Sequence, residues 1–205
     1  MGAYENLNEM QLDVLREIGN IGSGNACTAL AVLLGTMVDM TVPSIRFLDF
    51  DSIPEFFGGA SNPILGIQID VKNDLKGMMF HIVNKSFAQK IINTFYEKKL
   101  ETMDDLNDMD LSVLSEMGNI TSGAYANSLA TLTQMVVDIN SPIHHKTTIS
   151  ELLKIPLEAY GKVGEKVLVI DEQFIIHEEK ITNNMILVLD EESLQKLFNK
   201  LGISA

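Results

Sequence analysis

Two short stretches of this chain place a carboxylate and an amide at the same spacing. Residues 17–26 read EIGNIGSGNA and residues 116–125 read EMGNITSGAY. Each contains a glutamate followed three residues later by an asparagine, Glu17 with Asn20 and Glu116 with Asn119. An asparagine amide does not titrate near neutral pH, but it can hold a water molecule by donating and accepting hydrogen bonds. The pair could therefore position a substrate and a water molecule.

The residue types around these pairs narrow the chemistry further. A glutamate on an open helix face stays ionised and is better suited to binding a cation than to transferring a proton. Neither stretch sets a serine, cysteine or lysine beside a base, so covalent catalysis is not indicated. An amide that orients water for attack on a phosphoryl group is a known device when metal and positive charge are supplied as well. We expect a macromolecular substrate that brings both.

The glycines raise a second interpretation, a loop that binds phosphate. Such a loop needs its glycines between a strand and a helix, so that backbone N–H groups face the phosphate. The residues before Gly19 have helical spacing, no lysine follows the glycines, and Thr121 replaces Gly22 in the second stretch. A small-ligand or nucleotide sensor that uses these glycines is therefore the weakest of the three functions considered for this chain.

Helical periodicity separates two faces around each stretch. At 100° per residue, one face of the first helix is apolar and is expected to pack on a sheet. Its members are Leu12, Leu15, Ile18, Gly22, Ala26, Ala29, Leu30 and Leu33. The opposite stripe carries the polar groups, which are Asp13, Glu17, Asn20 and Gly24 in the first helix and Ser112, Glu116, Asn119 and Gly123 in the second. A glycine there leaves a bare spot that suits close approach by another surface, although tight packing within the protein is an alternative use of these glycines.

These stripes belong to a longer internal repeat. Residues 12–43 and 111–142 align without gaps and are identical at 15 of 32 positions. We therefore expect one domain, residues 1–205, made of two repeats at about 8–100 and 105–203. The predicted fold class is α/β, a pseudo-twofold duplication with a sheet of about six strands and two long surface helices.

The remaining elements follow the same order in both halves. Strands are expected at 64–71 and 76–83, and at 165–179 and 183–190, with turns at KNDL and EKITNN. Closing helices are expected from about Ser86 to Lys98 and from about Glu191 to Leu201. Surface loops are expected at 61–63 and 158–166. The acidic connector 101–110 offers aspartate and asparagine residues to cap the second long helix.

Composition excludes several classes of function. The net charge of −13 disfavours nucleic acid and anionic membranes as partners. No apolar run is long enough to cross a membrane and the first residues do not resemble a signal peptide, so a cytoplasmic protein is expected. The single cysteine, Cys27, is predicted to be a small core residue. The four histidines lack the spacing of metal ligands, and no metal site is expected.

The repeated motif resembles a known family. Its spacing is Asp or Ser, then Glu, Asn and Pro: Asp13, Glu17, Asn20 and Pro43, then Ser112, Glu116, Asn119 and Pro142. This pattern is similar to the signature of the CheC, CheX and FliY family of bacterial chemotaxis phosphatases, and the resemblance covers nearly the whole chain. Two intact motifs without an added flagellar switch domain are most similar to the CheC branch.

The resemblance implies a phosphatase that hydrolyses the phospho-aspartate of the response regulator CheY. Glu17 and Glu116 would each pair with a lysine of the regulator, and Asn20 and Asn119 would orient the attacking water. The protein would need no cofactor of its own, because the regulator holds Mg²⁺. The receptor deamidase CheD is a further candidate partner, and a monomer is expected. The rival hypothesis is a non-catalytic adaptor that binds the regulator or CheD with the same two faces.

Overall fold

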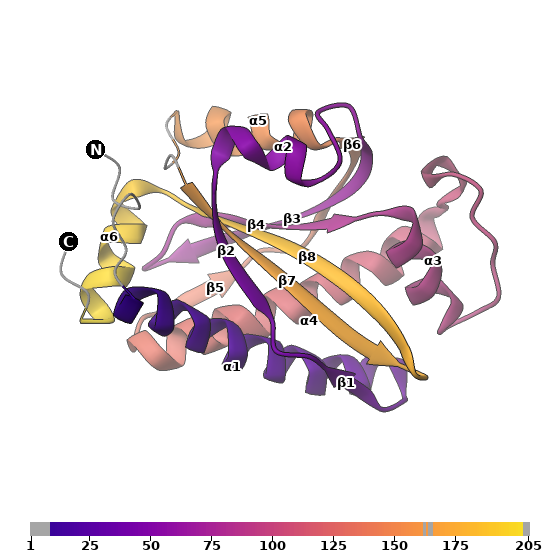
Figure 1. The fold of residues 1–205 in the computed structure, drawn as a ribbon, viewed down its shortest axis with the longest axis horizontal. Coiled ribbons are helices and arrows are strands. Elements are labelled where there is room, and N and C mark those ends of the chain that lie inside the picture. Colours follow the sequence, from indigo (N-terminus) through magenta and orange to yellow (C-terminus); the bar gives the residue numbers. More distant parts are fainter. Residues whose placement is uncertain (1–8, 162, 164–165, 203–205) are drawn as a thin grey trace.

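The computed structural model describes residues 9–161, 163 and 166–202. Within them, eight strands form one curled antiparallel sheet with helices on both faces (Figure 1). The helices are α1 (Glu9–Leu34), α2 (Ile53–Phe56), α3 (Lys85–Asn93), α4 (Asp108–Thr133), α5 (Ile149–Tyr160) and α6 (Glu191–Lys200). The strands are β1 (Val38–Met40), β2 (Ser44–Asp49), β3 (Pro63–Asn73), β4 (Gly77–Val83), β5 (Val137–Ile139), β6 (Ile143–Thr148), β7 (Lys166–Ile176) and β8 (Glu179–Leu189).

The two halves exchange strands. Each half forms its own hairpin, β3 with β4 and β7 with β8, and the two hairpins meet where β4 pairs with β8. The short strands of the first half, β1 and β2, pair with β7, whereas β5 and β6 of the second half pair with β3. In the order β1-β7-β8-β4-β3-β5, equivalent strands of the two repeats lie at equal distances from the two edges: β1 and β5, β7 and β3, and β8 and β4. The predicted pseudo-twofold duplication is therefore confirmed, with the halves interlaced rather than simply stacked.

The expectation of about six strands holds for the width of the sheet but not for the number of strands. β1 and β2 lie end to end beside β7, and β5 and β6 lie end to end beside β3. Pro43 and Pro142 stand at the two breaks. A proline has no backbone N–H to continue the ladder, so each edge strand is split in two.

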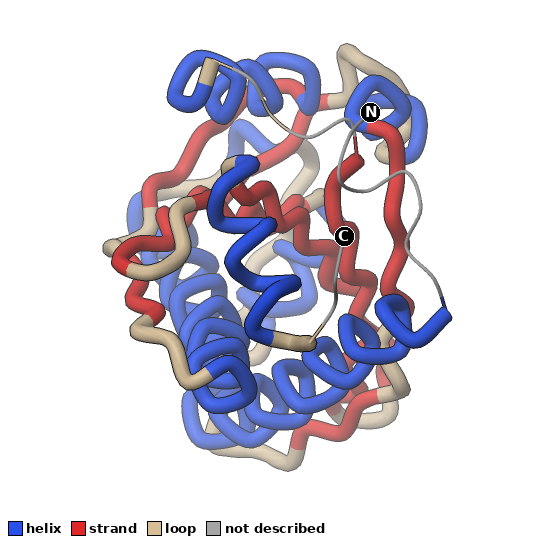
Figure 2. Tube along the Cα trace, turned by 90° about the vertical axis from the view of Figure 1, so that its left-hand side faces the viewer, coloured by secondary structure: helices blue, strands red, loops and turns tan. Residues whose placement is uncertain are grey.

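The two long predicted helices are present and lie side by side. α1 and α4 have 26 residues each and run antiparallel across one face of the sheet (Figures 1 and 2). The main core lies between this helix pair and the sheet. A smaller core lies under α2 and α5 on the opposite face. Cys27 is half-buried against the main core, and its thiol lies 3.0 Å from the carbonyl oxygen of Val38.

The acidic connector caps the second long helix as predicted. The side chain of Asn107 accepts a hydrogen bond from the backbone N–H of Asp110, and the carboxylate of Asp110 accepts one from the N–H of Asn107. This capping box satisfies two N–H groups that the helix itself leaves unpaired. The buried carboxylate of Asp110 is also paired with Lys98 and Tyr96. The start of α4 is thereby fixed close to its motif.

One predicted turn was wrong, and one predicted loop was wrong at its ends. The segment EKITNN lies inside β8, and the hairpin turns instead at His177 and Glu178, which both adopt positive φ. The loop predicted at 158–166 starts later than expected, because α5 continues to Tyr160 and ends before Gly161 at φ +68°. Gly161 and Val163 lie in neither a helix nor a strand, and residues 162, 164 and 165 lie outside the described residues. The expected loop at 61–63 ends where β3 starts at Pro63.

Candidate functional site

The motif stripe of α1 faces away from the sheet. Leu15 and Ile18 are each only 4% exposed on the inner side of the helix, whereas Glu17 and Asn20 are exposed. Asp13 and Gly24 are exposed on the same stripe. The periodicity prediction is therefore confirmed for the placement of these four residues, while their roles in a reaction stay predictions.

The second stripe is similar but more enclosed. Ser112 and Glu116 are exposed on α4, whereas Asn119 and Gly123 are half-buried. A Cβ atom at Gly123 would lie 3.8 Å from Cδ1 of Ile139, an ordinary contact, while one at Gly24 would meet nothing within 4 Å. The bare spot expected beside the amide is thus fully open only in the first copy.

Tight packing, the alternative role for the glycines, applies to other positions. A Cβ at Gly19 would lie 2.1 Å from Cδ1 of Ile45, and one at Gly22 would lie 2.5 Å from Cδ1 of Tyr125. A Cβ at Gly118 would lie 3.1 Å from Cγ2 of Ile67. These glycines let α1 and α4 lie directly on the sheet and on each other. Pro43 is buried beneath α1 near Gly19, and Pro142 is half-buried.

The glycine stretch does not form a phosphate-binding loop. Residues 19–24 lie in the middle of α1, so their backbone N–H groups lie within a continuous helix rather than at its start. The phosphate-loop geometry on which the hypothesis of a nucleotide sensor depended is therefore absent from this stretch.

The two motifs lie toward opposite ends of the helix pair. The helices meet after each asparagine, where Gly22 faces Tyr125 and Nδ2 of Asn25 donates a 3.2 Å hydrogen bond to Oγ of Ser128. Because the helices are antiparallel, Asn20 and Asn119 lie on opposite sides of this contact. Each stripe is thus separately open to a docking molecule.

A buried polar network that the sequence analysis missed links the two helices through the sheet. The hydroxyls of Ser23 and Tyr125 donate to Oε1 of Glu172 at 2.7 and 2.6 Å, and Nδ2 of Asn183 donates to Oε2 at 2.8 Å. Asn183 also contacts Nδ1 of His81 at 3.3 Å. Nε2 of His81 lies 2.8 Å from Oγ of Ser122 and 3.3 Å from Oγ1 of Thr121.

This network fixes the helices behind both motifs. Ser23 follows Asn20 by three residues, and Ser122 follows Asn119 by three residues. All members of the network are buried. Buried polar groups that are fully hydrogen-bonded define one arrangement of the elements that carry them, because any other arrangement leaves a polar group unpaired. Glu17 and Asn20, like their counterparts on α4, are therefore presented by a rigid support.

Burial shifts the pKa values within the network. Burial raises the pKa of the Glu172 carboxyl, and the hydrogen bonds from Tyr125, Ser23 and Asn183 oppose that shift. Burial, together with the charge of Glu172, holds the pKa of Tyr125 well above its ordinary value. The pKa of His81 is lowered to about 4 by burial, against the opposing effect of its hydrogen bond to Asn183.

We predict that His81 makes the protein less stable in mild acid. At pH 5 the imidazole is neutral in the folded protein but protonated in the unfolded chain, so the unfolded state binds more protons. Lowering the pH from 7 to 5 is therefore expected to reduce the free energy of unfolding by about 2 kcal/mol. Urea unfolding of the wild type and of His81→Gln at both pH values measures the difference, and Glu172 affects both proteins alike. Equal pH dependence in the two proteins would contradict the prediction.

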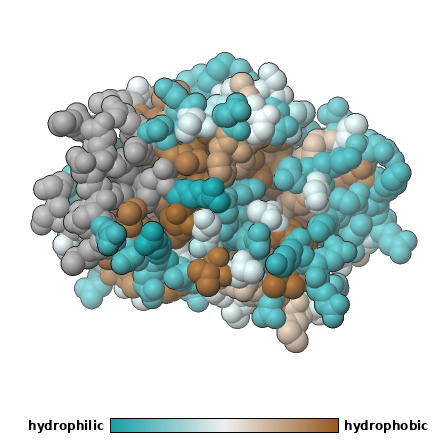
Figure 3. Space-filling view, viewed as in Figure 1, coloured by the Kyte–Doolittle hydropathy of each residue, from teal (hydrophilic) through white to brown (hydrophobic). Residues whose placement is uncertain are grey.

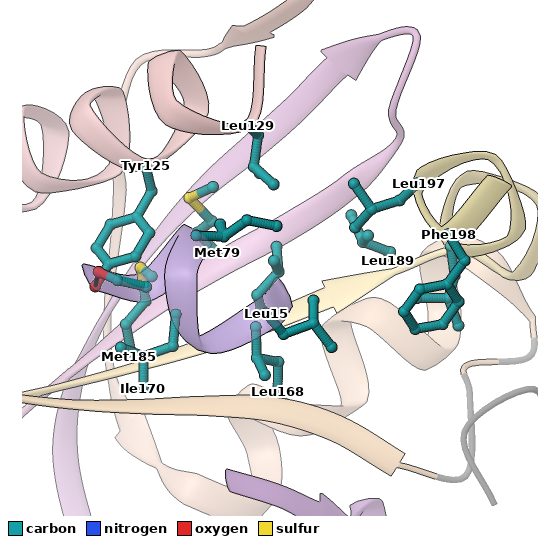
Figure 4. A pocket seen from close by; sticks show the side chains of 14 residues that line it. Leu15, Met79, Tyr125, Leu129, Leu168, Ile170, Met185, Leu189, Leu197 and Phe198 are labelled. Carbon is teal, nitrogen blue, oxygen red and sulfur yellow. Dashed lines mark hydrogen bonds between the residues drawn. The ribbon is translucent and has the colours of Figure 1, made fainter. Parts of the chain in front are cut away.

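An internal cavity lies beneath α1 between the helix pair, α6 and the sheet. It is lined by apolar side chains and holds only about 20 Å³, roughly one water molecule (Figure 4). Leu15, Tyr125 and Phe198 are among the side chains that surround it. The cavity has neither the size nor the polar groups of a substrate site.

Metal and membrane sites are not found in the described part of the chain. Among those residues, no group of three or more His, Cys, Asp or Glu side chains could hold a metal ion. No described helix is long and apolar enough to cross a membrane. One face of the molecule shows hydrophilic side chains spread widely with smaller apolar areas between them (Figure 3). The fold and the site thus define a scaffold that presents an outward carboxylate–amide pair on each of two helices, with the amide exposed in the first copy and half-buried in the second.

Comparison with known proteins identifies this scaffold. A family model described as the CheC-like family matches residues 10–46 and 109–145. The chain is 34% identical to the CheY-P phosphatase CheC of Bacillus subtilis (strain 168), over 100% of both chains. It is 30% identical to the flagellar motor switch phosphatase FliY of the same strain, over 67% of this chain and 36% of FliY. The chain belongs to the CheC-like family.

The solved structures agree on the fold. The crystal structure of Thermotoga maritima FliY matches with a TM-score of 0.71 and 22% identity, covering 96% of this chain and 98% of that chain. At this identity the likeness shows a shared fold alone.

Proposed function

We propose that this chain is a phosphatase that hydrolyses the aspartyl-phosphate of a CheY-type response regulator. The observation that carries the proposal is the outward-facing glutamate–asparagine pair, which occurs at equivalent places on two pseudo-symmetric helices. Membership of the CheC-like family and 34% identity to a CheY-P phosphatase over the whole chain support it.

In this proposal each helix enters the phosphorylation site of a docked regulator. Glu17 or Glu116 binds a cationic side chain of the regulator and sets the orientation of the two proteins. The amide of Asn20 or Asn119 then holds a water molecule in line with the phosphorus–oxygen bond to the aspartate. Attack by water breaks that bond, releases inorganic phosphate and restores the aspartate carboxylate.

Because each motif lies on an outward face of a helix, we expect the regulator to supply part of the catalytic machinery. An exposed helix cannot exclude water or surround a phosphoryl group with positive charge, and neither motif offers a nucleophile. The regulator must therefore supply the reactive bond and Mg²⁺, which neutralises charge on the phosphoryl oxygens. The chain needs no cofactor of its own. We also expect the protein to bind CheD, to be a monomer and to be cytoplasmic. These three expectations come from the family resemblance and the composition, not from contacts among the described residues.

The glutamates provide a test of docking. We predict that the Glu17→Gln, Glu116→Gln variant raises the KM for phosphorylated regulator about tenfold, equivalent to about 1.4 kcal/mol, with a smaller change in kcat. Glutamine keeps the size of the side chain and removes only its charge. The matched control is Glu191→Gln on α6, an exposed glutamate outside the motifs. An unchanged KM in the motif variant would rule out the proposed role of the glutamates.

A further inference from the structure

The two long helices carry a single basic side chain between them. Neither the 26 residues of α1 nor those of α4 include a lysine or histidine, and Arg16 is their only arginine. The protein around it is strongly acidic, with a net charge of −13. A lone cation on such a surface has a large effect on how an anionic group approaches that spot.

Arg16 lies next to the motif amide of the first site. It is exposed and precedes Asn20 by four residues, so the two side chains are neighbours on successive turns of α1. At 100° per residue, Arg16 lies about 40° to one side of Asn20 and Glu17 about 60° to the other. The amide of the first site is thus flanked by a cation and an anion.

In the free protein Asp13 holds this arginine on the stripe. Nη1 of Arg16 lies 2.7 Å from Oδ1 of Asp13, and the side chains are 58% and 68% exposed. An ion pair this exposed contributes little to stability and is easily exchanged for another partner. In the free protein the guanidinium is therefore directed toward Asp13, one turn before Arg16, by an ion pair that a docking partner can readily replace.

The second site lacks both members of this pair. Ser112 replaces Asp13 and Ser115 replaces Arg16, although the glutamate and asparagine are retained. Oγ of Ser112 instead donates a 2.8 Å hydrogen bond to the backbone carbonyl of Asp108. Because the aspartate and arginine are present or absent together, they form one unit. A unit found in one site only is not required for the shared chemistry, but it makes the two sites different.

We propose that Arg16 makes the first site selective for a partner with strong negative charge beside the reacting bond. On docking, the guanidinium leaves Asp13 and binds an anionic oxygen of the regulator, either on the phosphoryl group or on a neighbouring carboxylate. Its planar fork of N–H donors suits both groups. The inference rests on the proposed function, because it assigns a partner contact to the same site.

The two sites can be measured separately. Asn119→Ala leaves the first site to act, and Asn20→Ala leaves the second. In the Asn119→Ala background, Arg16→Ser is expected to lower kcat/KM for phosphorylated regulator about fivefold at low salt, and this difference shrinks at high salt because exposed charges are screened. In the Asn20→Ala background, the same Arg16→Ser change is the control, and activity through the second site should stay within about twofold.

Binding assays then locate the anionic oxygen. If Arg16→Ser weakens binding only of regulator carrying beryllium fluoride in place of the phosphoryl group, the contact is to the phosphoryl oxygens. If it weakens binding with and without beryllium fluoride, the contact is to a carboxylate. Either result supports the proposal. An unchanged first site, or an equal loss at both sites, overturns it. Failure of the proposed function has another signature, namely full activity in the variant that lacks both motif asparagines.

Discussion

Replacing Asn20 and Asn119 by alanine in one variant is expected to lower the stimulated rate of regulator dephosphorylation by roughly 100-fold or more. Alanine removes the amide that holds the water but keeps the helix, since both residues lie on outward stripes and neither supports the core. The measurement is the decay of phosphorylated regulator with and without the protein. Each single variant should retain the activity of the other site.

The control for this prediction is Asn199→Ala. Asn199 is an exposed asparagine on α6, outside both motif stripes, and its removal should leave the decay rate unchanged. Thermal unfolding of all variants checks that the fold is intact. Wild-type activity in a folded Asn20→Ala, Asn119→Ala protein would exclude water orientation by these amides.

The second large effect is expected on stability. Gly22→Ala should lower the free energy of unfolding by about 3 kcal/mol, because the new Cβ lies 2.5 Å from the Tyr125 ring. The ring cannot simply turn away, since its hydroxyl donates to the buried carboxylate of Glu172. Moving it would leave that carboxylate short of a hydrogen bond. Urea unfolding measures the change.

Gly24→Ala is the matched control, the same substitution two residues further along α1. A Cβ there meets nothing within 4 Å, and alanine favours a helix over glycine by up to about 1 kcal/mol. This variant should therefore be as stable as the wild type or more so. If Gly22→Ala were equally stable, the close packing of α1 on α4 would be wrong.

The exposed site could be predicted because it depends on local periodicity. The helical repeat separates Leu15 and Ile18 from Glu17 and Asn20, and the second copy shows which outward residues are retained. The same argument assigned Gly24 to open space. It placed Gly22 on the packed face, but it could not identify what Gly19 and Gly22 touch, because those atoms come from β2 and α4, far away in sequence.

The exchange of strands was beyond local reasoning. Each segment has the composition of a strand, but nothing in β1 and β2 specifies that their partner is β7 in the other half. The hairpin turn was missed because His177 and Glu178 occupy positions with positive φ that usually take glycine or asparagine. α5 was missed because its counterpart in the first half, α2, has only four residues.

The buried network did leave a signal in the sequence. Along β7, Leu168, Ile170, Phe174 and Ile176 alternate on the face that packs against the long helices, and Glu172 occupies the position between them. His81 takes the corresponding place between Met79 and Val83 on β4. A polar residue at a core position of a strand indicates a buried partner. The identity of that partner requires the tertiary fold.

The most direct test of the central claim is turnover. Phosphorylated regulator is mixed with a substoichiometric amount of the wild-type protein, and the phosphorylated fraction is followed over time. If the exposed amides orient water for repeated hydrolysis, all of the phosphorylated regulator disappears faster than it does alone, at a rate proportional to the amount of protein added. If the protein only binds the regulator, the excess decays at its own rate, and the phosphatase account is contradicted.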